Sequence, residues 1–132
     1  MISHTTEKAV SAKGTRRVLY VDDMRELREV ARLALSKAGH KVDCAADGSD
    51  AFEMITAKPG AYDIVISDHH MGIMNGLELV MKLREIKYPG MIAIVSSEMN
   101  REVAEDYRRL GVERLLYKPV ELSDLRALVL ES

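Results

Sequence analysis

Residues 62–68 read YDIVISD, a segment in which three β-branched residues, Ile64-Val65-Ile66, lead directly into Ser67 and Asp68. An uninterrupted apolar run of this length is typical of a strand that is buried on both faces of a parallel sheet. Similar continuous runs lie at 18–21 and 92–95, and shorter or alternating ones lie at 41–45 and 114–117. The sequence therefore predicts five strands.

Amphipathic stretches separate these runs. In the first of them, Leu27, Ala31 and Ala34 recur at helical spacing, and Gly39 stands where a helix-ending glycine belongs. Comparable patterns occur around residues 51–55, 79–86, 103–110 and 122–129. Alternation of strand and helix predicts an α/β fold, a doubly wound five-stranded parallel sheet with helices on both faces. At this length we expect the flavodoxin-like strand order 2-1-3-4-5.

The composition limits the class of protein. The 132 residues are 47% hydrophobic and 30% charged, which fits one soluble globular domain. A net charge of -2 argues against holding nucleic acid by bulk charge, and the apolar runs are too short to span a membrane. Residues 1–15 lack apolar periodicity, so we expect a flexible N-terminal tail before a domain over 16–132. Cys44 is the single cysteine, which is consistent with a cytoplasmic location.

Polar residues follow four of the five predicted strands. Asp22 and Asp23 follow the first, Asp68 the third, Ser96 the fourth and Lys118 the fifth. Strands 1, 3, 4 and 5 are neighbours in the expected order, and ligands of open α/β sheets bind at the carboxyl ends of the strands. The sequence therefore predicts that three carboxylates, a hydroxyl and an ammonium group converge in one crevice.

Such a cluster has a defined chemistry. Three crowded carboxylates call for a cation or for raised pKa values, and an all-oxygen site suits Mg²⁺. A carboxylate can also act as a nucleophile toward a phosphoryl group, which gives an aspartyl phosphate. A metal ion and Lys118 would then neutralise charge on the transferring oxygens.

In these motifs the chain resembles the receiver domains of two-component response regulators, of the chemotaxis-regulator type. The resemblance covers about Arg16 to the end of the chain and keeps the family order of its motifs, which are VLYVDD at 18–23, YDIVISDHHMGIMNG at 62–76, IVSS at 94–97 and YKP at 117–119. Members of this family are known examples of the strand order 2-1-3-4-5, so the resemblance and the strand pattern agree.

The resemblance assigns the acidic residues. Asp68 matches the phosphoacceptor of the family. Asp23 matches the residue that holds Mg²⁺ directly, and Asp22 the one that acts mainly through water. The backbone carbonyl of His70, two positions after the acceptor, is expected to supply a further metal ligand. The histidines at 69 and 70 are themselves expected to be exposed loop residues rather than ligands of a transition metal.

The other motif positions follow in the same way. Ser96 and Lys118 match the hydroxyl and the lysine that bind the phosphoryl group, and the Lys118–Pro119 bond is expected to be cis. His70 and Glu98 match positions that tune the lifetime of the phosphoryl group. Ser96 is also a candidate cap of the following helix, although Ser97 is the better one.

Two departures from the family pattern concern switching. Gly72 stands in place of the usual proline, which should loosen the loop after the third strand. Leu115 occupies the position of the usual switch aromatic, and Tyr117 lies on the same face of the strand two residues later. These departures favour an alternative function, a pseudo-receiver that binds a protein partner without phosphoryl turnover. The intact aspartate, serine and lysine set favours a working receiver.

The resemblance also implies partners. A histidine kinase or a histidine phosphotransfer protein would donate the phosphoryl group, and a downstream protein would bind the face formed by the fourth helix, the fifth strand and the fifth helix. Several arginines enrich this last third of the chain, namely Arg101, Arg108, Arg109, Arg114 and Arg126. Such a domain catalyses only its own phosphoryl transfer and slow autodephosphorylation. A phosphatase with an aspartate nucleophile would need a carboxylate at position 70, and a flavodoxin would need a phosphate-binding loop in place of Asp22-Asp23.

Overall fold

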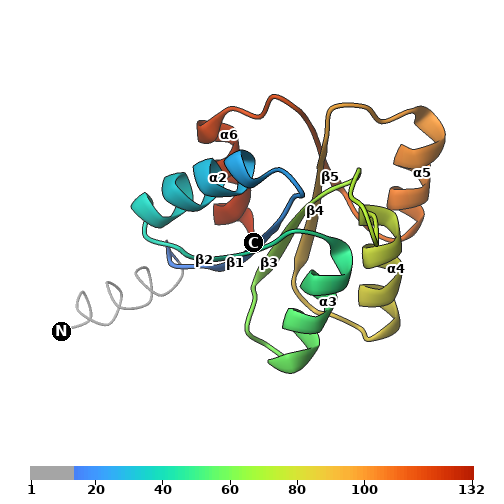
Figure 1. The fold of residues 1–132 in the computed structure, drawn as a ribbon, viewed down its shortest axis with the longest axis horizontal. Coiled ribbons are helices and arrows are strands. Elements are labelled where there is room, and N and C mark those ends of the chain that lie inside the picture. The colour runs from blue at the N-terminus through green and yellow to red at the C-terminus, as the bar shows by residue number, and fades with distance from the viewer. Residues whose placement is uncertain (1–13) are drawn as a thin grey trace, which may run out of the picture.

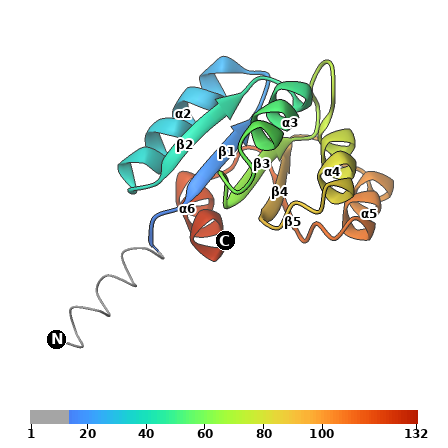
Figure 2. The same ribbon diagram turned by 90° about the horizontal axis from the view of Figure 1, so that it is seen from below.

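The computed structural model describes residues 14–132, so all but the last two residues of the predicted tail lie outside the described part of the chain. Its sheet has five parallel strands in the order β2-β1-β3-β4-β5, as predicted. Figure 2 shows the strands side by side in this order. The strands are β1 (Arg17–Val21), β2 (Lys41–Ala45), β3 (Ile64–Asp68), β4 (Met91–Ser96) and β5 (Arg114–Tyr117).

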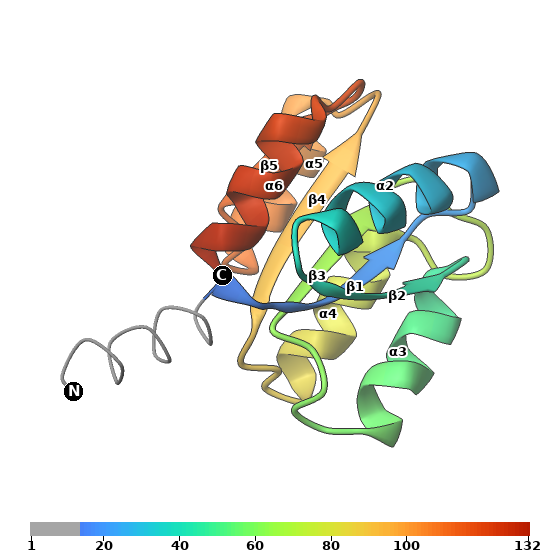
Figure 3. The ribbon, with the colours of Figure 1, turned by 90° about the vertical axis from the view of Figure 1, so that its left-hand side faces the viewer.

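Five helices cover the sheet on its two faces. Helices α3, α4 and α5 lie on one face, and α2 and α6 lie next to each other on the opposite face (Figures 1 and 3). None of the helices in the described residues is long and apolar enough to cross a membrane. The helices are α2 (Arg25–Lys37), α3 (Gly48–Ala57), α4 (Gly76–Glu85), α5 (Arg101–Arg109) and α6 (Leu122–Glu131).

The alternation of side chains along each strand divides the core in two. Leu19, Val65 and Ile94 point toward α3, α4 and α5, whereas their chain neighbours Ile64 and Ile66 point toward α2 and α6. Each of these residues has no exposed surface. Because both faces are covered, the central strands need a continuous apolar sequence, which is the pattern that 64–66 displays.

Two boundaries differ from the sequence-based expectation. Asp68 and Ser96 are the last residues of β3 and β4 rather than the first residues of loops, because Asp68 pairs with Val95 and Ser96 with Tyr117 in the parallel ladder. The expectation that Ser97 caps the next helix is wrong. The cap of α5 is Asn100, whose side chain accepts a hydrogen bond from the backbone N–H of Val103.

The glycine that ends the first helix is where the sequence predicts it. Gly39 has φ of 98°, a left-handed conformation that residues with a side chain rarely adopt, and its N–H donates to the carbonyl of Ser36. The chain turns there into β2, so the end of α2 fixes where the edge strand begins.

Candidate functional site

Backbone hydrogen bonds continue past the strand ends and bring the polar residues together. The N–H of Asp22 donates to the carbonyl of Ala45, and the N–H of Lys118 donates to the carbonyl of Ser96. Between them, Asp68 pairs with Val95 in the centre of the sheet. The carboxyl ends of β1, β3, β4 and β5 therefore share one edge of the sheet.

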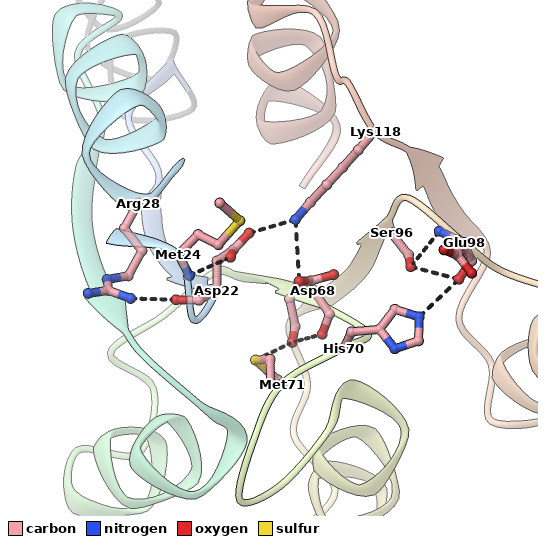
Figure 4. A network of polar contacts seen from close by, with 10 residues as sticks. Asp22, Met24, Arg28, Asp68, His70, Met71, Ser96, Glu98 and Lys118 are labelled. Carbon is pink, nitrogen blue, oxygen red and sulfur yellow. Dashed lines mark hydrogen bonds and ion pairs between the residues drawn. The ribbon is translucent and has the colours of Figure 1, made fainter. Parts of the chain in front are cut away.

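Lys118 lies between two buried carboxylates. Its Nζ is 3.0 Å from Oδ2 of Asp22 and 3.3 Å from Oδ2 of Asp68, as Figure 4 shows. Asp22 is 1% and Asp68 7% exposed. The ammonium group thus neutralises part of a charge cluster that water reaches poorly, and such a contact acts more strongly than a surface ion pair.

The pKa values in this cluster shift for identifiable reasons. Burial raises the pKa of Asp68, and the charge of Asp22 adds to that shift, while Lys118 opposes it. Burial alone would lower the pKa of Lys118, but its hydrogen bonds and its attraction to Asp22 and Asp68 outweigh burial, so the pKa is raised. Lys118 therefore remains an ammonium group at neutral pH.

The two adjacent aspartates differ in what surrounds them. Both side-chain oxygens of Asp22 have protein donors, because Oδ1 accepts from the N–H of Met24 and Oδ2 from Lys118. Its carbonyl accepts from Nη1 of Arg28 at 2.7 Å, a contact that fixes the loop after β1 and that sequence reasoning missed. The carboxylate of Asp23 is exposed and has no protein hydrogen bond within residues 14–132.

The three carboxylates fit a divalent cation. Asp22, Asp23 and Asp68 each offer an oxygen, and these oxygens lie within 4.8 Å of one another. An acidic pocket of oxygen ligands that is partly open to water is the kind of site that Mg²⁺ prefers. Of the three, Asp23 has the carboxylate with the fewest protein contacts, whereas both carboxylate oxygens of Asp22 already accept hydrogen bonds from the protein.

Ser96 is buried at the same edge, but its hydroxyl is bound elsewhere. It donates to the carbonyl of Glu98 at 2.9 Å, and Figure 4 shows it pointing toward Glu98. The same carbonyl lies 3.3 Å from Nε2 of His70, which is exposed as expected. Glu98 thus joins the loops after β3 and β4 through its backbone.

His69 differs from the expectation of an exposed loop residue, which is wrong for this position. It is half-buried, and a hydrogen bond of 2.6 Å joins its Nδ1 to the hydroxyl of Tyr107, a fully buried residue of α5. Burial lowers the pKa of His69, and the neighbouring His70 adds to this shift, so the ring is neutral at pH 7. Periodicity identified Tyr107 as a core residue, but nothing in the sequence indicates its contact with His69.

The positions at which the sequence departs from the family pattern are Leu115 and Gly72. Leu115 packs against the core cluster beneath α3, α4 and α5, whereas Tyr117 is 58% exposed, so β5 contributes no buried aromatic side chain. Gly72 is exposed, and a Cβ added to it would meet no atom within 4 Å. The Lys118–Pro119 peptide bond is cis, as the resemblance implied.

Comparison with known proteins identifies the class. Residues 18–130 match the response regulator receiver domain family, and the chain belongs to that family. Receiver domains are signalling regulators of two-component systems rather than classical enzymes, and they generally bind Mg²⁺ at an acidic pocket. The doubly wound fold, the aspartate cluster and the cis bond before Pro119 are all consistent with this assignment.

Particular relatives agree with the family. The chain is 33% identical over 113 residues to the sensory/regulatory protein RpfC of Xanthomonas campestris, and 32% identical over 117 residues to the aerobic respiration control sensor protein ArcB of Escherichia coli. These matches cover 83% and 85% of the chain but only 15% and 14% of the relatives. The solved structure of chemotaxis protein CheY4 of Vibrio cholerae is 28% identical, with a TM-score of 0.81 over 89% of this chain and 98% of that one.

Proposed function

We propose that this chain is a working phosphoacceptor, in which Asp68 receives a phosphoryl group from a phosphohistidine donor. The observation that carries the proposal is the position of Asp68, which lies at the centre of the sheet edge beside an ammonium group and two further carboxylates. A surface cluster would not need an ammonium group within 3.3 Å of two buried carboxylates, whereas phosphoryl transfer needs such a cation beside the nucleophile.

The reaction needs few parts. A carboxylate oxygen of Asp68 attacks phosphorus, an O–P bond forms, the P–N bond to the donor imidazole breaks, and its electron pair returns to that nitrogen. Lys118 stays protonated and interacts with an equatorial phosphoryl oxygen. Bound Mg²⁺, held by Asp23, Asp22, Asp68 and the carbonyl of His70, would neutralise charge on the transferring oxygens.

Ser96 has a place in the same reaction. Its hydroxyl donates to a phosphoryl oxygen once its bond to the carbonyl of Glu98 breaks. That exchange replaces a neutral hydrogen bond with one to a charged acceptor, which is the stronger kind. His70 and Glu98 border the acceptor and tune how long the phosphoryl group survives.

The partners follow from the class. A histidine kinase or a histidine phosphotransfer protein in the cytoplasm donates to Asp68, and the names of RpfC and ArcB as sensory and sensor proteins support a place in such a system. A downstream protein binds the face formed by α5, β5 and α6, and neither nucleic acid nor membrane is a direct partner. We propose residues 16–132 as the bounds of the receiver domain.

The charge of that face is smaller than the arginine count suggests. Arg109 pairs with Glu105 and Asp106 on its own helix, and Arg114 on β5 pairs with Glu131 of α6 at 2.6 Å. Acidic residues of the same face thus offset much of its positive charge. We infer that shape and apolar contacts contribute more to the downstream interaction than bulk charge does.

One observation favours the alternative, a pseudo-receiver. Leu115 replaces the aromatic residue that would move on activation, so the common switch is absent from β5. A pseudo-receiver would bind its partner through the same face without turnover at Asp68.

Phosphorylation of Asp68 distinguishes the working receiver from the pseudo-receiver. The protein is incubated with Mg²⁺ and acetyl phosphate, and its intact mass is measured beside Asp68→Asn and a control, Asp50→Asn, which changes an exposed aspartate of α3. A gain of one phosphoryl group in the wild type and in the control, and none in Asp68→Asn, supports the proposal. No gain in the wild type, with no response of its amide NMR spectrum to beryllofluoride, would establish the pseudo-receiver.

A further inference from the structure

A hydrogen bond joins the loop between β3 and α4, residues 69–75 (the acceptor loop), to helix α5. Tyr107 is fully buried on α5, and its hydroxyl lies 2.6 Å from Nδ1 of His69, the residue directly after Asp68. The two rings meet edge to face with centroids 5.5 Å apart. The contact therefore has both a polar and a packing component, and it links residues that are far apart in the chain.

The surroundings leave this contact little freedom. Gly76 begins α4, and a Cβ at this position would lie 2.6 Å from the Tyr107 hydroxyl and 2.7 Å from the carbonyl of Asp68. The N–H of Gly76 donates to the carbonyl of His69 at 3.0 Å, which closes the loop. The acceptor loop, the start of α4 and the ring of Tyr107 are thus packed so closely that a shift of one displaces the others.

Strand β5 offers no comparable connection. Its aromatic residue, Tyr117, is exposed, and Leu115, which packs against the core, has no polar group in its side chain. Tyr107 is thus the aromatic side chain of the core that reaches the residue next to the acceptor.

We propose that Tyr107 is a positioning residue: its hydrogen bond to His69 holds the loop that follows Asp68 and transmits a change at Asp68 to helix α5. The proposal rests on the phosphoacceptor function of Asp68. In the phosphorylated state the loop adjusts to the new charge, the His69–Tyr107 contact changes with it, and α5 responds because Tyr107 is part of that helix.

The chain contains a matched control. Tyr88 is also buried, belongs to the same core cluster, and donates its hydroxyl to the carbonyl of Tyr62 at 2.9 Å. It lies before β4, at the opposite end of the strands from Asp68. Tyr107→Phe and Tyr88→Phe therefore remove the same group from the same core, and only the first removes a contact with the acceptor loop.

The test measures amide hydrogen exchange in α5, residues 101–109, with and without Mg²⁺ and beryllofluoride. Acceptance by Asp68 is followed separately by mass gain with acetyl phosphate. The variants are Tyr107→Phe, Tyr88→Phe, and a pair at position 69: His69→Asn keeps a polar atom near the place of Nδ1, whereas His69→Leu removes it. Exchange without beryllofluoride reports the stability that each variant loses.

We expect Tyr107→Phe and His69→Leu still to accept the phosphoryl group. In both variants, the change that beryllofluoride causes in the amide exchange of α5 should be roughly fivefold smaller, which is the equilibrium effect of losing one neutral hydrogen bond. Tyr88→Phe and His69→Asn should keep the response. Equal responses in Tyr107→Phe and Tyr88→Phe would overturn the role of Tyr107 but leave the proposed function intact. The same holds if His69→Asn loses the response to the same extent as His69→Leu. A wild type that gains no mass would overturn the proposed function and this inference with it.

Discussion

The hydroxyl of Ser96 lies 2.9 Å from the carbonyl oxygen of Glu98, two residues further along the chain, and not on the acceptor carboxylate. The N–H of Glu98 in turn approaches the same hydroxyl at 3.3 Å. Ser96 is therefore held by its own loop in this state, and under the proposed function it exchanges this partner for a phosphoryl oxygen.

This exchange predicts the effect of Ser96→Ala. The variant should still accept the phosphoryl group, because Asp68 and Lys118 are unchanged. It should bind beryllofluoride roughly fivefold more weakly, since a bond to a charged acceptor is worth about 1 kcal/mol more than the neutral bond it replaces. Titration followed by amide NMR measures the affinity. Ser97→Ala, an exposed neighbour, is the control, and equal affinities in both variants would refute the role of Ser96.

A second prediction concerns the cation. Asp23 has the carboxylate that is free to bind it, so Mg²⁺ at ten times its dissociation constant should raise the free energy of unfolding of the wild type by about 1.4 kcal/mol. If Asp23→Asn weakens binding tenfold, the gain falls to about 0.4 kcal/mol. Urea denaturation with and without Mg²⁺ measures both. Asp50→Asn should keep the full gain, and a full gain in Asp23→Asn as well would exclude Asp23 as a ligand.

The fold could be predicted from the sequence because its information is local and repetitive. The apolar run at 64–66 identifies a strand covered on both faces, and alternation of such runs with helical patterns leaves few topologies. The same topology brings Asp22, Asp68 and Lys118 together, because the strands that precede them are neighbours in the sheet. The convergence of these three residues could therefore be predicted without knowledge of any side-chain contact.

Contacts that depend on how a helix or loop is placed could not be predicted. His69 and Tyr107 are 38 residues apart, and their hydrogen bond depends on how α5 packs on the sheet. The cap of α5 depends on the length of the loop after Ser96, which no periodicity encodes. Ser97 and Asn100 both have a suitable side chain, and only the structure shows that the helix begins after Asn100.

The position of that cap gives a third prediction. Asn100→Ala removes the acceptor of the Val103 N–H and should lower the free energy of unfolding by about 1 kcal/mol. Ser97→Ala should change it by less than about 0.5 kcal/mol, because Ser97 is exposed and caps nothing. Urea denaturation compares the two. A larger loss in Ser97→Ala would place the start of α5 nearer to Ser97.

A fourth prediction uses two glycines with open space around them. A Cβ at Gly72 or at Gly39 meets no atom within 4 Å, but Gly39 has φ of 98° and Gly72 is outside that left-handed region. Gly72→Ala should stabilise the protein by about 0.4–1 kcal/mol by restricting the unfolded chain. Gly39→Ala should destabilise it by about 1–3 kcal/mol through backbone strain. Thermal unfolding shows whether each variant is more or less stable than the wild type. Destabilisation by Gly72→Ala would mean that the loop after β3 needs a backbone conformation that only glycine adopts readily.

The last prediction is a pH dependence that arises far from the acceptor. His40 is 6% exposed, and its Nδ1 accepts a hydrogen bond from the N–H of Arg16 at 3.0 Å. Burial lowers the pKa of His40 in the folded state, and the charge of Arg16 lowers it further. The unfolded chain, with a pKa near 6.5, therefore binds a proton more readily than the folded protein does. It follows that the contribution of neutral His40 to stability is complete above about pH 6.5 and is lost as the pH falls toward the lowered pKa.

Urea denaturation between about pH 8 and pH 5 should show a steeper decline in the free energy of unfolding of the wild type than of His40→Asn, which can accept the same hydrogen bond and does not titrate. The difference in stability between the two proteins at pH 8 gives the cost of the substitution itself. If that difference stays constant down to pH 5, His40 makes no contribution to the acid sensitivity of the fold.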